Sequence, residues 1–285
     1  LRPAELVGNR TEELERPKFL AIVSSLTLAK ALAEDPSSRP NGFVVEGSEA
    51  GGHNAPPAKM RFDANGRPVY QYTEEDRADI PGIARLGLPF WLAGAYATPE
   101  RLREAVAKGA SGIQFGTAAA LAGQSCMAPD MRRKALELLS GNALKVSNTM
   151  VSPTGFPFKV AMIPGTISDS AVYESRKRVC DIGLLQATYL KADGTLGYRC
   201  PAESVEEFTA KGGRAQNTVG RGCLCNGLLS ATGLAQIRAN GYVEPPIVTL
   251  GEDFTAVKEM LAQLPPGQDT YAIGKLMLYL RKGLG

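Results

Sequence analysis

The sequence lacks features that several classes of protein require. It contains a single histidine, His53, so a histidine-rich metal site is excluded. The 32 basic residues exceed the 29 acidic ones by only three charges, which gives no indication of nucleic-acid binding. The longest apolar runs, residues 19–29 and 86–97, are shorter than the roughly 20 residues of a membrane helix, so we expect no membrane partner. The 31 glycines follow no Gly-X-Y period, which excludes collagen.

Cysteine is also scarce, with five residues in a chain of 285. An odd number in a chain of this length is not typical of a secreted disulfide framework. The first residues show no basic-then-apolar signal pattern, so we expect a protein of the reducing cytoplasm. The chain starts at Leu1 rather than Met, and we expect it to be part of a longer protein. Its composition, 44% hydrophobic and 21% charged, is that of a globular protein.

Short apolar runs alternate with helical patterns in the first two-fifths of the chain. We predict strands at residues 19–25, 42–46, 89–93 and 111–115, the first of them buried on both faces, with helices after the first, third and fourth. Repeated βα units of this kind predict an α/β fold with a parallel sheet. Two arrangements of such a sheet are possible, a (β/α)8 barrel and a doubly wound open sheet. Four units make half of the barrel. The polar segment 54–80 is predicted to be an insertion or lid.

The pattern changes after about residue 125. We predict a helix at residues 131–140 and a rigid, turn-rich loop at 151–159. From residue 168 the tail has helical patterns at 173–181, 204–211, 228–240, 253–263 and 274–281. The sequence therefore predicts two domains, an α/β domain over residues 1–167 and a helical, cysteine-containing extension over residues 168–285.

The segment that follows the second strand has the strongest pattern for a functional site. It reads Glu46-Gly-Ser-Glu-Ala-Gly-Gly-His53. Active sites of parallel α/β folds lie at the carboxyl ends of the strands, and adjacent glycines let the backbone approach a ligand closely. The ordinary imidazole pKa of about 6.5 suits proton transfer near neutral pH. The alternative interpretation is a plain Gly-Gly turn with a surface histidine.

Two later βα turns place a glycine and a hydroxyl residue between a strand and a helix. One contains Gly94 and Thr98, and the other contains Gln114, Gly116 and Thr117. Unpaired N–H groups at helix starts bind phosphate, and many barrels bind phosphate after strands seven and eight. If the four units are the second half of a barrel, these turns fall on those two loops. Chain geometry alone is the alternative reason for each glycine. No GxGxxG, P-loop or GxSxG pattern is present.

Four of the cysteines, Cys180, Cys200, Cys223 and Cys225, lie in the tail. Four thiols can hold one zinc ion, but the paired Cys-x2-Cys spacing of common zinc sites is missing. Reduced structural thiols are therefore favoured, so we predict no metal, with zinc or redox chemistry as the alternative.

Three motifs in order resemble the nitronate monooxygenases, also called 2-nitropropane dioxygenases. They are Glu49-Ala-Gly-Gly-His53, Leu92-Ala-Gly-Ala-Tyr96 and Ile113-Gln-Phe-Gly-Thr117, and the resemblance spans about residues 17–165. It implies a TIM barrel that binds FMN non-covalently, with His53 as the catalytic histidine. The cofactor-binding residues that it implies are Glu49, Ala50, Gly51, Gly52, Gly94, Ala95, Gln114, Gly116 and Thr117.

The tail is similar to one subgroup of that family, near the enoyl-reductase-like proteins of polyketide and polyunsaturated fatty-acid synthesis. The similar stretches are residues 178–183, 197–201 and 221–226. This chain departs from the family pattern in two ways. Ala95 stands where the family usually has a second glycine, and residues 1–16 are too few to hold the N-terminal barrel strands. We therefore expect the C-terminal half of a TIM barrel with a helical extension.

The resemblance implies an FMN-dependent oxidoreductase that oxidises alkyl nitronates, a small-molecule substrate, with O2. One alternative is an enoyl reductase that passes hydride from NAD(P)H through FMN to a carrier-bound acyl thioester. A second is a non-catalytic interaction protein with a zinc-stabilised cysteine module. Half a barrel leaves strand edges unpaired, so we expect weak FMN binding unless the missing half comes in trans or from a second copy in a homo-oligomer.

Overall fold

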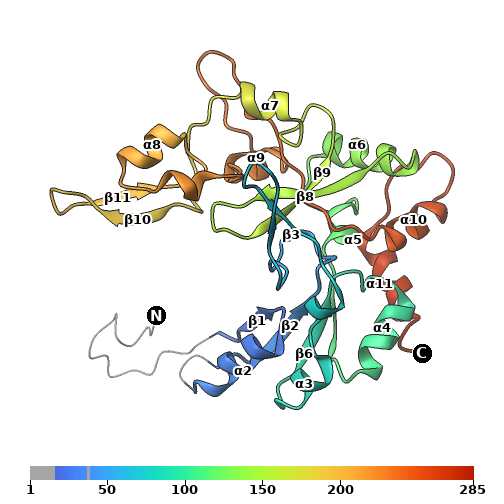
Figure 1. Ribbon diagram of the computed structural model, residues 1–285. Coiled ribbons are helices and arrows are strands. Elements are labelled where there is room, and N and C mark those ends of the chain that lie inside the picture. Colours follow the sequence, from blue (N-terminus) through green and yellow to red (C-terminus); the bar gives the residue numbers. More distant parts are fainter. Residues whose placement is uncertain (1–16, 37–38) are drawn as a thin grey trace, which may run out of the picture.

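The computed structural model describes residues 17–36 and 39–285 (Figure 1). All four strands predicted in the first part are present, as β1 (Leu20–Val23), β2 (Gly42–Glu46), β6 (Phe90–Ala93) and β7 (Gly112–Gln114). They form one parallel sheet in the order β1-β2-β6-β7. The predicted α/β fold with a parallel sheet is therefore confirmed. The order is the same for half a barrel and for an open sheet, so the half-barrel stays a prediction. The expectation for residues 1–16 lies outside the described residues.

The predicted burial of β1 on both faces is wrong. Ala21 and Val23 are buried, whereas Leu20 and Ile22 are 41% and 58% exposed. The strand lies at one end of the sheet order, and only one of its faces packs on the core. The alternation is therefore that of a half-buried strand.

Helices follow the strands, as α2 (Leu26–Glu34), α3 (Ile80–Ala84), α4 (Pro99–Ala107) and α5 (Thr117–Ala120). Each of the first three begins at a side chain that accepts a backbone N–H, namely Ser25, Asp79 and Thr98. The predicted insertion contains β3 (Gly52–His53), a small hairpin of β4 (Arg61–Phe62) and β5 (Pro68–Val69), and the 3-10 helix η1 (Glu74–Asp76).

A second sheet joins the insertion to the middle of the chain. It has the order β3-β9-β8, with β8 at Lys145–Val151 and β9 at Pro157–Met162. The prediction of a turn-rich loop over residues 151–159 is therefore wrong at both ends. Only residues 152–156 form the turn, which Ser152 N–H closes on Phe156 O at 2.8 Å. The two prolines and Gly155 favoured a loop in the sequence-based prediction. Strand β9 nevertheless begins at Pro157, and its first five residues are all buried.

The remaining helices are α6 (Pro129–Ser140), α7 (Ser170–Ser175), α8 (Val205–Ala210), α9 (Cys225–Ser230), α10 (Thr255–Ala262) and α11 (Ile273–Arg281). The extension is less helical than predicted, because β10 (Ala187–Leu190) and β11 (Leu196–Arg199) form a hairpin and η2 (Ala215–Thr218) is a 3-10 turn. Two predicted helices are shorter than expected. The helix predicted at 228–240 is α9, which ends before the left-handed Gly233, and the one at 173–181 ends at Ser175.

The largest hydrophobic core joins both predicted domains. Leu121 and Leu136 pack in one cluster with Tyr271 and Leu276, and the Tyr271 hydroxyl donates to Ala118 O at 2.6 Å. Figure 1 shows α10 and α11 beside α4 and α5, with α8 and the β10–β11 hairpin at the far side. The segment 246–285 thus helps to hold the carboxyl ends of the sheet strands. No described helix has the length and apolar character needed to cross a membrane.

Candidate functional site

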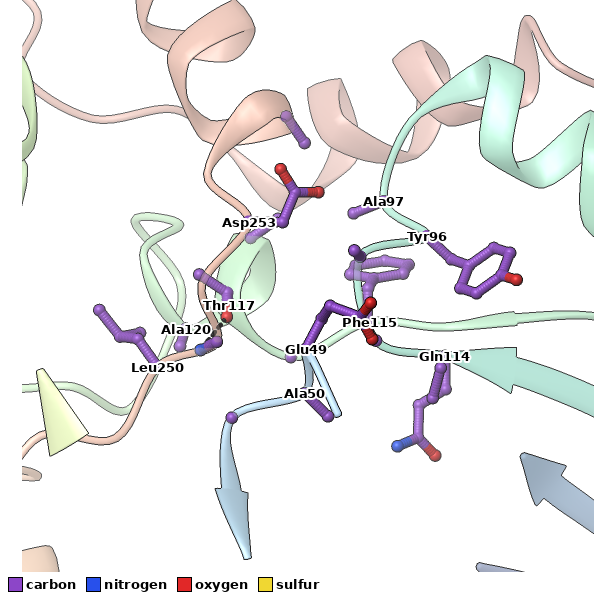
Figure 2. Close-up of a pocket in the computed structure, with 18 of the residues that line it drawn as sticks. Glu49, Ala50, Tyr96, Ala97, Gln114, Phe115, Thr117, Ala120, Leu250 and Asp253 are labelled. Carbon is purple, nitrogen blue, oxygen red and sulfur yellow. Dashed lines mark hydrogen bonds between the residues drawn. The ribbon is translucent and has the colours of Figure 1, made fainter. Parts of the chain in front are cut away.

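A cavity of about 280 Å³ opens at the carboxyl ends of β2, β6 and β7. Eight of the nine residues that the family resemblance implies for cofactor binding line this cavity. They are Glu49, Ala50, Gly51, Gly94, Ala95, Gln114, Gly116 and Thr117. The ninth, Gly52, does not. Three segments that are distant in sequence therefore meet in one place, and Figure 2 shows Glu49, Gln114 and Thr117 together there.

The turn after β6 has an unusual backbone. Gly94 has a φ of 86°, and a Cβ on it would lie 3.3 Å from the backbone nitrogens of Gly47 and Ala50. Ala95 follows with a φ of 59°, in the left-handed region that side chains disfavour. The turn therefore needs glycine at residue 94 and tolerates alanine at residue 95 only with strain.

The two βα turns leave backbone donors free beside the cavity. Among the described residues, no acceptor is bonded to the N–H groups of Ala95, Gly116 or Thr117. Gly116 has open space where a Cβ would stand. The four-residue helix α5 is too short for a large dipole, so these N–H groups themselves are what an anion would meet.

The fourth wall of the cavity comes from a segment that sequence analysis missed. Residues 249–253 run along the glycine-rich loop, and Gly251 N–H donates to the Thr117 hydroxyl at 2.8 Å (Figure 2). A Cβ on Gly51 would lie 2.6 Å from Gly251 N, so backbone packing requires glycine at residue 51. The only feature of the sequence that marks this segment is Gly251, which is followed by Glu252 and Asp253 just before a helix.

His53 lies outside the cavity lining. Its strand β3 pairs with β9, and its ring meets the Phe158 ring edge-on, with centroids 4.9 Å apart. His53 is exposed, and desolvation on the side that packs on Phe158 lowers the pKa of the ring from its ordinary value. His53 is therefore neutral at pH 7, two residues beyond Gly51, which does line the cavity.

Glu46, the last residue of β2, begins the motif that sequence analysis selected, but it was given no role there. Burial raises the pKa of its carboxyl to about 7, and the positive charge of Lys159 opposes that rise. No hydrogen bond or ion pair holds this carboxylate within the described part of the chain.

Lys159 was missed as well, because it lies in the segment predicted to be a loop. Its side chain is 1% exposed. The ammonium donates to the carbonyl of Ser48 and lies 2.9 Å from Glu252 Oε1. It therefore ties β9 to the glycine-rich loop and to the 249–253 segment.

The cysteines give no support to a metal centre. Over residues 17–36 and 39–285, no group of three or more His, Cys, Asp or Glu side chains could hold a metal ion. All five thiols are free; Cys126 and Cys180 are exposed, and Cys200 is buried.

No protein-family model matches the chain, and no curated protein matches its sequence. Several solved structures do match the chain. FabK from Thermotoga maritima is 21% identical with a TM-score of 0.37, over 54% of this chain and 42% of that one. A nitroalkane oxidase from Streptomyces ansochromogenes is 18% identical with a TM-score of 0.35, over 50% of this chain and 37% of its own.

The enoyl reductase domain of MlnA, from the macrolactin biosynthesis cluster of Bacillus amyloliquefaciens, is 14% identical with a TM-score of 0.46, over 93% of this chain and 68% of that domain. This chain spans about two-fifths of FabK. These levels of identity and superposition identify neither the reaction nor the substrate of this chain.

Proposed function

We propose that the cavity at the strand ends binds FMN and that the protein is a flavin-dependent oxidoreductase. The observation that carries this proposal is the meeting of two βα turns whose free N–H groups lie beside one cavity. Donors of this kind suit a phosphate. The N–H groups of Ala95, Gly116 and Thr117 would hold it, and the Thr117 hydroxyl keeps its own proton to donate.

The residues present fit such a group at its phosphate end. Gly116 leaves room where a Cβ would stand, and Ala50, Ala93 and Phe115 give the cavity apolar surface for a flat ring. A volume of about 280 Å³ is at the low end for a ligand pocket. The predicted missing half of the barrel, from a longer chain or a second copy, would complete the wall. The chemistry that FMN supplies when bound is two-electron transfer between a substrate and an acceptor.

The reaction that we propose is oxidation of alkyl nitronates by O2, as in the family that the motifs resemble. The α-proton of a nitroalkane is acidic, and its removal leaves an electron-rich anion. His53 is neutral at pH 7 because desolvation lowers its pKa, so its ring can accept such a proton. Its position two residues after Gly51 places it near the cavity rather than in its wall.

A second candidate is an enoyl reductase that acts on a carrier-bound acyl thioester. Two of the three tail stretches that resemble the enoyl-reductase-like subgroup, 178–183 and 221–226, are bonded to each other, and the first also bonds to Ala202, the residue after the stretch 197–201. Arg178 Nη1 donates to Ala202 O at 3.2 Å, and Asn226 Nδ2 donates to Val179 O at 2.8 Å. The similarity of the tail therefore describes one folded unit rather than scattered residues.

The test begins with FMN titrated into the purified protein, followed by flavin fluorescence and absorbance. Saturable quenching is expected, and its absence would remove the flavin assignment. Anaerobic reduction of the bound flavin then separates the reactions, because propyl-2-nitronate reduces it in one case and NADPH in the other. His53→Asn tests the histidine, and unchanged FMN affinity together with unchanged turnover would show that His53 has no part in the chemistry.

A further inference from the structure

Glu46 occupies a junction between cavities. Besides the cavity of about 280 Å³, two others of about 400 Å³ and 260 Å³ open around the end of β2. Glu46 is the only described residue that lines all three. Its backbone is fixed by the parallel pairing of β2 with β6, opposite Ala93. A small molecule that enters from any of these openings meets this carboxyl.

Every other carboxylate that lines these cavities has a partner. Asp76 accepts from Ala58 N at 2.6 Å, and Glu104 pairs with Lys108 at 2.6 Å. The remaining ones are held by nearby side chains or backbone: Glu49, Glu74, Glu75 and Asp253. Among the described carboxylates of these walls, only that of Glu46 has no hydrogen bond and no ion pair. A half-buried carboxyl without a partner is costly to a fold unless a ligand uses it.

The buried ammonium group of Lys159 acts electrostatically on the Glu46 carboxyl. Lys159 holds the carbonyl of Ser48, two residues after Glu46, and is itself paired with Glu252. Its charge acts on Glu46 without a direct bond between them. Lys159 therefore fixes the loop after Glu46, and its positive charge limits the rise in the pKa of the Glu46 carboxyl.

We propose that Glu46 is an acid–base residue of the site, which exchanges a proton with the substrate where the three cavities meet, and that Lys159 is its positioning residue. This proposal rests on the proposed function and assigns the removal of the substrate proton to Glu46 rather than to His53. With a nitroalkane, a carboxylate oxygen of Glu46 takes the proton from the carbon next to the nitro group. The C–H electron pair stays on the substrate as the nitronate, and the carboxyl becomes neutral. His53, which lines none of the three cavities, acts from outside this junction.

The electrostatics permit both forms of the carboxyl near neutral pH, since the pKa of Glu46 is raised to about 7. Lys159 is the charge that acts on it directly, and Glu49 and Asp253 line the first cavity with it. The other ionisable groups of the second and third cavities are Glu49, Tyr72, Glu74, Glu75, Asp76, Arg77, Tyr96, Arg101, Glu104 and Lys108. Arg77 pairs with Glu74, and Arg101 and Lys108 share Glu104, so the last group keeps one net positive charge.

The test compares Glu46→Gln with Glu137→Gln, a substitution of an exposed glutamate on α6 outside the cavities. FMN affinity is measured first, then turnover of neutral 2-nitropropane and of pre-formed propyl-2-nitronate. Glu46→Gln should lower turnover of 2-nitropropane by about 100-fold or more, in line with general-base catalysis. Turnover of the nitronate, which has no proton to lose, should change only a few-fold. Equal loss on both substrates, or no loss on either, overturns the proposal.

A failure of the proposed function would look different, because then the unaltered protein binds FMN and turns over neither nitro compound. In that case the absorbance of bound FMN is followed against pH. A pH-dependent step that is lost in Glu46→Gln and kept in His53→Asn supports Glu46, and a step unchanged in both overturns its role. If FMN does not bind at all, both the proposed function and this role are wrong.

Two further readouts address the parts of the proposal separately. Infrared spectra of the protein without FMN should show a neutral carboxyl band at pH 6 that Glu46→Gln removes, and a band that remains contradicts the assignment. Glu252→Gln tests Lys159, because it removes the anion that offsets the lysine charge. The pH–rate profile should shift to lower pH, since a stronger positive charge favours ionised Glu46. A profile that does not move would show that Lys159 only supports the fold.

Discussion

The hydroxyl of Thr117 accepts a hydrogen bond from Gly251 N–H at 2.8 Å, across 134 residues of chain. This bond joins the first residue of α5 to the segment that leads into α10. It holds the turn with the free N–H groups against the glycine-rich loop, because Gly251 also packs on Gly51. The geometry of the site therefore depends on a part of the chain outside the four βα units.

Thr117→Val should destabilise the protein and weaken FMN binding. Valine keeps the shape of threonine but leaves Gly251 N–H without an acceptor, which costs about 1–3 kcal/mol where water cannot replace it. Urea unfolding measures the loss, and FMN titration measures the affinity. Thr117→Ser is the matched control, because it keeps the hydroxyl. If the valine and serine variants unfold at the same urea concentration, the bond has no energetic weight.

Ala95→Gly should stabilise the protein. Ala95 has a φ of 59°, and a left-handed conformation costs an L-residue roughly 1–2 kcal/mol. Glycine removes that strain but adds about 0.5–1 kcal/mol of unfolded-state entropy. The expected net gain is therefore between about 0 and 1.5 kcal/mol in the free energy of unfolding, measured by urea denaturation. Ala97→Gly, in the same loop, lacks the strained backbone and should only destabilise; a gain there would point to a different cause.

Much of the first half of the fold could be predicted from the sequence. The four apolar runs are short and bounded by turn residues, so local pattern alone located β1, β2, β6 and β7. Thr98, noted in the sequence as the hydroxyl residue between a strand and a helix, is the N-cap of α4. The meeting of three loops in one cavity also followed, because the carboxyl ends of parallel strands share one edge of the sheet.

The second sheet and the far wall of the site could not be predicted in this way. Strand β9 pairs with β3 across about a hundred residues, and nothing in the local pattern around Pro157 indicates that pairing. Lys159 was missed for the same reason. Glu46 was overlooked because a carboxylate at a strand end is ordinary in sequence, and only the structure shows that it lacks a partner.

The buried ion pair of the extension should be costly to break. Arg176 and Glu244 side chains are 1% and 2% exposed and lie 2.6 Å apart. Glu244→Ala leaves the guanidinium buried without its charge partner, and a loss of about 3–5 kcal/mol is expected. Glu75→Ala, which breaks the exposed pair with Lys59, should cost less than about 1 kcal/mol. Urea denaturation of both variants is the measurement, and similar losses would contradict the role of burial.

The stability difference between Glu46→Gln and the unaltered protein should grow with pH. Folding raises the pKa of Glu46 from 4.5 to about 7, so the folded protein holds a proton that the unfolded chain releases. The unaltered protein therefore loses stability as pH rises from 4.5 to 7, and glutamine, which cannot ionise, does not share this loss. The variant should be the more stable above pH 7, by on the order of 1–2 kcal/mol because solvent screens part of the effect.

Urea denaturation of both proteins without FMN, at unit steps from pH 5 to 9, measures this difference. Charges elsewhere contribute equally to both proteins and cancel. The difference should be small at pH 5 and level off above pH 7. Glu137→Gln, whose side chain is exposed on α6, should show a difference that does not follow this curve. A constant offset for Glu46→Gln would mean that its carboxyl ionises alike in the folded and unfolded chain, and the basis for its acid–base role would be lost.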